Sequence, residues 1–141
     1  MKKKVDIDWL IRMSIKDMRE INNPEAEVKF RTDGYDKYGY GEIECTGRVK
    51  NKEKMGDFIN TFGRMLAEGE KFDANAAHCI YDNDENLLYK FQVFYGRVFG
   101  EQLIILYPDF EKEIHDRWKN EKLNISREDV SDIIQPLSMY N

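Results

Sequence analysis

The sequence predicts an α+β domain in which helices cover one antiparallel sheet of about five strands. Several short runs alternate apolar and polar residues with the period of a strand, and other runs repeat apolar residues at the three- and four-residue spacing of a helix. Short links join successive strands, which favours antiparallel pairing. The expected order is α-β-β-α-β-β-β-α-α, over residues 1–141 as a single compact domain.

The first expected element is a helix from about Asp6 to Asn22. Its apolar or small residues recur at spacings of three and four: Ile7, Ile11, Ser14, Met18 and Ile21. Pro24 follows closely, and proline disrupts the hydrogen bonding of a helix interior. The helix is therefore expected to end before this residue.

Two strands are expected next, on either side of a loop at residues 34–41. Their inward-facing residues alternate with polar ones: Val28, Phe30 and Thr32 before the loop, and Ile43, Cys45, Gly47 and Val49 after it. A period of two is typical of half-buried strands. The two runs are close enough in sequence to pair as a hairpin with a long loop.

A second helix is expected between Asn51, which is a favourable capping residue, and Gly69. Acidic residues near its start complement the helix dipole. The apolar stripe is regular: Met55, Phe58, Ile59, Phe62, Met65 and Leu66. Such a stripe of Met and Phe is expected to be core.

The second half of the chain predicts three strands and two helices. The strands lie at residues 76–81, 87–95 and 103–107, and the last is apolar enough to be covered on both faces. One helix is expected from Asp109 to about Lys119. A shorter helix begins with the cap-like Ser126-Arg127-Glu128-Asp129 and ends at Pro136.

The loop at residues 34–41 contains three tyrosines among three glycines, which is unusual. Tyrosine gives a large contact area at low rotamer entropy, and glycine allows backbone conformations with positive φ. We expect its side chains to contact a binding partner: Tyr35, Asp36, Tyr38 and Tyr40. The alternative is that the tyrosines pack on the rim of the sheet.

The charge balance excludes some functions and suggests a second surface. The chain has 27 acidic and 22 basic residues, a net charge of −5, which argues against direct binding of nucleic acid or membranes. If they fold close together, six residues form an acidic partner-binding patch: Glu68, Glu70, Asp73, Asp82, Asp84 and Glu85. Otherwise they are solvated turns.

Motifs for chemistry are incomplete, so we expect no catalytic residues, no metal and no cofactor. A calcium loop starting at Asp82 lacks the required glycine and glutamate at its sixth and twelfth positions, which are Leu87 and Val93. The glycines of the tyrosine loop are not followed by the lysine and hydroxyl of a phosphate-binding loop. His115 and Glu111, four residues apart on a helix, could reach one metal ion, but no third ligand follows at a metal-site spacing.

The sequence also predicts a cytoplasmic protein. The basic N-terminus is followed by charged residues where a signal peptide requires an apolar run, and no run is long enough to cross a membrane. Cys45 and Cys79 do not form a secreted disulfide pattern, and both are expected to be reduced.

These features together predict a non-catalytic protein that inhibits or escorts a larger basic protein. In composition and size the chain resembles phage-encoded inhibitors of host nucleases, such as anti-CRISPR proteins, and the immunity proteins of nuclease toxins. The resemblance implies steric and electrostatic blocking of a nucleic-acid-processing enzyme, with carboxylates in a groove meant for phosphates and tyrosines as anchors.

Two alternatives remain open. The first is a small-molecule-binding domain or minor enzyme, with a pocket between the helices and one strand face: Tyr89, Phe91, Val93 and Tyr95. The second is a structural subunit of a homo-oligomer that uses the tyrosine loop or an exposed sheet edge.

Overall fold

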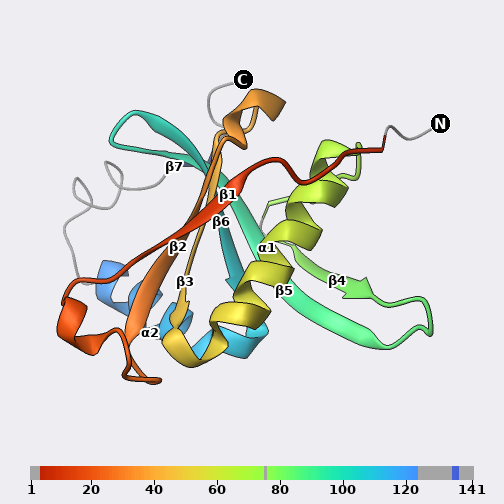
Figure 1. Ribbon diagram of the computed structural model, residues 1–141. Coiled ribbons are helices and arrows are strands. Elements are labelled where there is room, and N and C mark those ends of the chain that lie inside the picture. Colours follow the sequence, from red (N-terminus) through yellow and green to blue (C-terminus); the bar gives the residue numbers. More distant parts are fainter. Residues whose placement is uncertain (1–3, 75, 124–134, 137–141) are drawn as a thin grey trace.

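The computed structural model describes residues 4–74, 76–123 and 135–136, and confirms the α+β class (Figure 1). Six strands lie across one sheet in the order β1-β2-β3-β6-β5-β4, and a short β7 pairs with β5. The strands are β1 (Leu10–Ser14), β2 (Glu27–Asp33), β3 (Glu42–Arg48), β4 (Ala77–Tyr81), β5 (Leu87–Val98), β6 (Glu101–Pro108) and β7 (Gln135–Pro136). The helices are α1 (Lys52–Ala67) and α2 (Lys112–Leu123).

The sheet is mixed, so the prediction of a wholly antiparallel sheet is wrong. Strands β3 and β6 pair in parallel, with Ile43 opposite Ile104, whereas the other neighbours in the six-strand order pair antiparallel. The parallel pair joins two hairpin-built halves that are distant in the sequence. Short links between consecutive strands indicate the pairing within each half, but they carry no information on how the halves meet.

Helix α1 lies across one face of the sheet and forms the core with it (Figure 1). The predicted apolar stripe of this helix is confirmed, since Met55, Phe58, Ile59 and Phe62 are fully buried and Leu66 is nearly so. Their rings and side chains meet the inward face of the central strands, as in the contact between Phe62 and Phe91, whose ring centroids are 5.7 Å apart. This layer fixes the position of everything built on the sheet.

The N-terminal helix is not formed, and the segment is extended instead. Residues 10–14 form β1, which pairs antiparallel with β2, and only a single 3-10 turn follows at Met18–Glu20. Ile11, Met13 and Ile15 pack against the core while the residues between them are exposed. The same apolar residues therefore satisfy a period of two, and pairing with β2 supplies main-chain hydrogen bonds to both strands.

The residues before β1 are anchored on α1. Trp9 is buried, and its indole N–H donates to Asn60 Oδ1 at 2.9 Å. Nearer the N-terminus, the backbone N–H of Val5 donates to Glu68 Oε1 at 3.1 Å. These bonds hold the extended segment along the helix, where Figure 1 shows it crossing the molecule.

The predicted capping role of Asn51 is wrong, whereas the predicted third helix is confirmed. Asn51 occupies the N-cap position of α1, but its side chain makes no capping bond and donates instead to Glu111 Oε1 at 3.0 Å. The predicted third helix is confirmed as a 3-10 turn at Asp109–Glu111 followed by α2. The predicted fourth helix lies outside the described residues except at its end, where Gln135 and Pro136 form β7. Among the described residues, no helix is long and apolar enough to cross a membrane.

Candidate binding surface

The tyrosine loop is folded onto the protein, so the expectation of three outward rings is wrong for Tyr35. Its side chain has 0% exposure, and its hydroxyl donates to the carbonyl oxygen of Gly63 at 2.7 Å. The ring packs edge-on against Trp9, with centroids 4.9 Å apart. Tyr35 is therefore a core residue that offers no surface to a partner in this structure.

The other two tyrosines lie on the rim of the sheet, as the alternative described. Tyr38 is half-buried against Tyr35, at a centroid distance of 5.0 Å, and Tyr40 is half-buried against Tyr95 at 6.0 Å. Asp36 is exposed beside them. Binding of a partner by Tyr38, Tyr40 and Asp36 stays a prediction, with much less aromatic area than the sequence suggested.

The carboxylate of Glu42 holds this loop in place. Oε1 accepts from the Thr32 hydroxyl at 2.8 Å and from the Tyr35 N–H at 2.9 Å, and Oε2 accepts from the N–H groups of Gly34 and Asp36 at 3.3 Å each. Successive N–H groups that converge in this way form a typical anion site. Here the protein's own carboxylate fills that site, so the loop is not a phosphate cradle.

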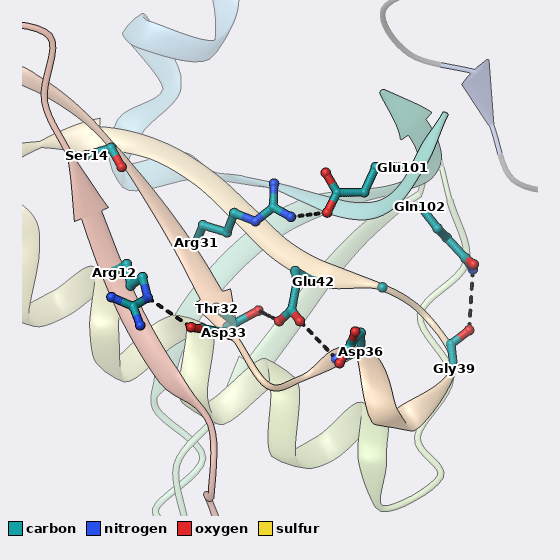
Figure 2. A pocket seen from close by; sticks show the side chains of 11 residues that line it. Arg12, Ser14, Arg31, Thr32, Asp33, Asp36, Gly39, Glu42, Glu101 and Gln102 are labelled. Carbon is teal, nitrogen blue, oxygen red and sulfur yellow. Dashed lines mark hydrogen bonds and ion pairs between the residues drawn. The ribbon is translucent and has the colours of Figure 1, made fainter. Parts of the chain in front are cut away.

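A polar groove lies on the sheet face beside Glu42, with a volume of about 500 Å³ (Figure 2). Arg12 pairs with Asp33 at 2.9 Å, while Arg31 forms ion pairs with Glu101 and, at 3.5 Å, with Glu44. Burial would lower the pKa of Arg31, but the surrounding carboxylates outweigh it and raise the pKa. The groove is therefore lined by charges of both signs that already neutralise one another.

The six acidic residues do not form one patch. Glu68, Glu70 and Asp73 lie at the end of α1 and in the link to β4, whereas Asp82, Asp84 and Glu85 form the turn between β4 and β5. The five residues of β4 separate the two groups by roughly 16 Å at about 3.3 Å per residue. We call them the link carboxylates and the turn carboxylates.

The turn carboxylates are organised around Asp82. Its Oδ1 accepts from the backbone N–H groups of Asp84 and Asn86, both at 2.9 Å. These donors, that of Asn86 foremost, lower the pKa of Asp82, which keeps the side chain negative. Asp84 and Glu85 are exposed at the end of the hairpin.

Uncovered apolar side chains gather at this same hairpin end. Tyr81 is 58% exposed, Leu87 53% and Leu88 45%, and the register places Tyr81 opposite Leu87. Figure 1 shows the β4–β5 hairpin extending past α1. We call these three residues the hairpin cluster. Sequence reasoning missed it by treating Leu87 and Leu88 as the start of a core strand, although two leucines directly after an acidic turn were a signal.

A second uncovered ring lies at the turn between β5 and β6. Phe99 is 87% exposed, and its backbone has a φ of 51°, a conformation that non-glycine residues rarely adopt. With Gly100 at a φ of 81° it forms a two-residue turn that closes the hairpin. In the sequence, only the position of Phe99 directly before Gly100 indicates the turn.

The face on which a ligand pocket was expected is filled by the protein itself. Phe91 and Val93 are buried, and the ring of Phe58 lies 5.0 Å from that of Tyr89 and 5.1 Å from that of Phe91. The Tyr95 hydroxyl donates to the carbonyl oxygen of Phe72 at 2.7 Å. These side chains occupy the space between sheet and helix.

The histidines and cysteines have separate structural environments. His78 Nε2 lies 2.8 Å from the carbonyl oxygen of Asp73, while His115 Nε2 lies 3.0 Å from that of Thr46. Cys45 is fully buried, which raises the pKa of its thiol, whereas Cys79 is exposed on β4. Within the described residues no group of three such side chains is placed to bind a metal ion.

A second hollow of about 420 Å³ lies beside α2. Its walls include Tyr107, Lys112, His115 and Asp116, and Lys90 lies at its edge on β5. Tyr107 and His115 pack edge-on, with ring centroids 5.0 Å apart. Phenol, imidazole, ammonium and carboxylate groups all line this hollow, although Lys112 and Asp116 form an ion pair with each other.

Comparison with known proteins identifies no relative of the chain. No protein-family model matches the chain, and neither a curated protein nor a solved structure is significantly similar to it. The functional argument therefore depends on the residues and their geometry.

Proposed function

We propose that the protein is a non-catalytic binding protein that inhibits or escorts a larger basic, nucleic-acid-processing enzyme by covering part of its surface. The observation that supports this proposal is the hairpin cluster, an uncovered apolar surface next to the turn carboxylates. Apolar anchors surrounded by charge are typical of protein interfaces, in which the anchors give affinity and the charges select the partner.

The partner is expected to be basic because of what surrounds the cluster. Asp84 and Glu85 are exposed beside it, and Asp82 has a lowered pKa that maintains its charge. The net charge of −5 adds a long-range attraction for a basic surface. An enzyme that binds nucleic acid presents such a surface, and a protein bound there excludes phosphates by occupying their site.

Other charged and reactive groups have structural tasks, which also supports a binding role. Glu42 holds the tyrosine loop, and the buried Glu111 accepts from the backbone N–H of Arg48 and from Asn51. The raised pKa of Cys45 disfavours the thiolate that a nucleophile requires. The surface around the β4–β5 hairpin is therefore the better candidate for function.

Titration of the chain into assays of purified nucleases and nucleic-acid-binding enzymes tests the proposal. We expect stoichiometric inhibition or protection of one enzyme, weakened by salt. The variant Tyr81→Ser/Leu87→Ser/Leu88→Ser is expected to lose the effect, because the apolar anchors are gone. The matched control is Leu10→Ser/Met18→Ser, which removes side chains that are 63% and 67% exposed elsewhere. Equal loss in both variants, or no effect on any enzyme, would contradict the proposal.

The hollow beside α2 favours a second candidate, a small-molecule-binding domain. Its phenol, imidazole and ammonium groups provide polar contacts at one site: Tyr107, His115 and Lys112. A metabolite that raises the melting temperature of the chain, and fails to do so with Lys112→Met, would support this candidate. The matched control is Lys54→Met on α1.

A further inference from the structure

Strand β4 is an open edge of the sheet. It is the last strand of the six-strand order, and within the described part of the chain it pairs with β5 alone. Its outer side therefore carries main-chain N–H and C=O groups available to another strand. The opposite edge strand, β1, differs because Arg12 lies at its centre in an ion pair with Asp33.

Most of the devices that protect sheet edges are missing from β4. Its sequence, Ala-His-Cys-Ile-Tyr, contains no lysine, arginine, carboxylate or proline. A register shift between Ile80 and Tyr81 is the one irregularity of its pairing, and it lies at the end next to the turn. Residues 77–80 are thus a regular, uncharged edge.

We infer that β4 binds an extended basic segment of the partner protein, which adds to the sheet as a further strand. The inference depends on the proposed function and specifies how the partner is held. Main-chain hydrogen bonds supply affinity in this mode, and the side chains on either side supply specificity. The five residues of β4 allow contact with a partner segment of similar length, roughly 16 Å.

Charge at the two ends of β4 identifies the chemistry of that segment. Asp73 lies at the start of the strand, where its carbonyl oxygen contacts His78, and the turn carboxylates lie at its end. Between them the exposed side chains are uncharged: Ala77, Cys79 and Tyr81. A segment with apolar or β-branched residues at its centre and Lys or Arg at both ends is complementary to this pattern.

The same pattern disfavours a second copy of the chain as the added strand. Antiparallel pairing of two β4 strands about their central Cys79 would place Asp82 of one chain opposite residue 76 of the other, so the turn carboxylates would lie at the end of β4 that Asp73 precedes. Like charges at both ends of such a pair repel each other. The charges therefore favour a basic protein over self-association.

Selection from a displayed library of random twelve-residue peptides on the full chain tests the inference. We expect enriched sequences with Lys or Arg flanking an alternating apolar centre. A synthetic consensus peptide is expected to slow hydrogen exchange of the amides in residues 77–81. It is expected to leave exchange in β1, the other edge, unchanged.

Matched variants locate the peptide. Cys79→Lys places a charge at the centre of the exposed β4 edge and is expected to weaken peptide binding by about tenfold, a loss of about 1.4 kcal/mol. Ser14→Lys places the same charge on β1 and is expected to have little effect. Asp84→Asn/Glu85→Gln removes charge at the end of β4 and is expected to weaken binding and reduce its salt dependence. Asp6→Asn/Asp57→Asn is its control.

Several results would overturn the inference. They are enrichment of no peptide, enrichment of peptides without basic residues, or protection that lies outside β4. Concentration-dependent dimerisation of the chain alone, with protection of β4, would assign the edge to a second copy instead. Enzyme inhibition through the hairpin cluster could still be observed with any of these results. Failure of strand addition at β4 is therefore distinguishable from failure of the proposed function.

Discussion

At the scale of single residues, Glu42 shows how a polar side chain can replace secondary structure. Four donors around one carboxylate fix a loop that contains only one short 3-10 turn. We expect Glu42→Gln to lower the free energy of unfolding by about 1–3 kcal/mol, because an amide NH₂ would face N–H donors. Urea denaturation measures this loss.

The matched control for this substitution is Glu44→Gln on the same strand. Among the described residues Glu44 forms two long ion pairs, at 3.7 Å to Lys29 and 3.5 Å to Arg31. Partly exposed pairs contribute little, so a loss below about 1 kcal/mol is expected. Similar losses for both variants would show that Glu42 acts only through its charge.

Phe99 combines strain with exposure. A turn with positive φ at both central residues favours Asn followed by Gly, and here Phe precedes Gly100. We expect Phe99→Asn to raise the free energy of unfolding by about 1 kcal/mol, as judged by chemical denaturation. Leu88→Asn, which also removes an exposed apolar side chain but lies within β5, is expected to bring no gain.

At the scale of elements, α1 contains two glycines in different surroundings, one open and one tightly packed. A Cβ at Gly56 would meet nothing within 4 Å, whereas one at Gly63 would lie 3.0 Å from the Trp9 ring and 3.1 Å from the Tyr35 ring. Gly56→Ala is therefore expected to stabilise the protein by about 0.5–1 kcal/mol through helix propensity. Gly63→Ala is expected to destabilise it, because packed aromatic rings cannot move without opening gaps.

Thermal unfolding of the two variants separates these effects. Since both substitutions have the same intrinsic helix propensity, the difference in stability between them measures how closely α1 packs at Gly63 against Trp9, Tyr35 and Ile43. Equal stabilisation by both variants would contradict the tight packing at Gly63.

The elements that sequence patterns predict well are those with a single possible period. The stripe of α1 and the strands β2, β3 and β5 are confirmed, because their helical spacing or alternation has no competing interpretation, and β6 is confirmed from its nearly continuous apolar run. The segment before Pro24 satisfies both periods, since Ile11 and Ile15 fit a helix while Ile11, Met13 and Ile15 fit a strand. Only the open edge of β2 decides between them, and that edge is a tertiary feature.

The candidate site was harder to predict, for a related reason. Polarity suggested that the tyrosine loop is exposed, but Glu42 supplies the loop's donors with an acceptor, and this allows Tyr35 to enter the core. Of the six acidic residues, Asp82, Asp84 and Glu85 form a charged turn, and their separation from the other three by β4 follows from strand pairing. Long-range contacts of this kind leave no signal in local composition.

At the scale of the whole molecule, buried phenols link stability to alkaline pH. Burial foremost raises the pKa of Tyr35, Tyr95 and Tyr107 well above the ordinary value of about 10. In the unfolded chain these groups ionise near pH 10, so unfolding releases protons above that pH. Their contribution to stability is fully present below about pH 10 and is lost as the pH rises further.

Parallel titrations follow this linkage from pH 8 upward, with tyrosinate absorbance reporting ionisation and far-ultraviolet circular dichroism reporting the fold. We expect the native spectrum to persist until Tyr35, Tyr95 and Tyr107 begin to ionise. These buried phenols are expected to ionise together with cooperative unfolding, because a phenolate at such a position would lose most of its solvation. Ionisation of all tyrosines in one step near pH 10, with the native spectrum intact, would contradict the burial of these rings.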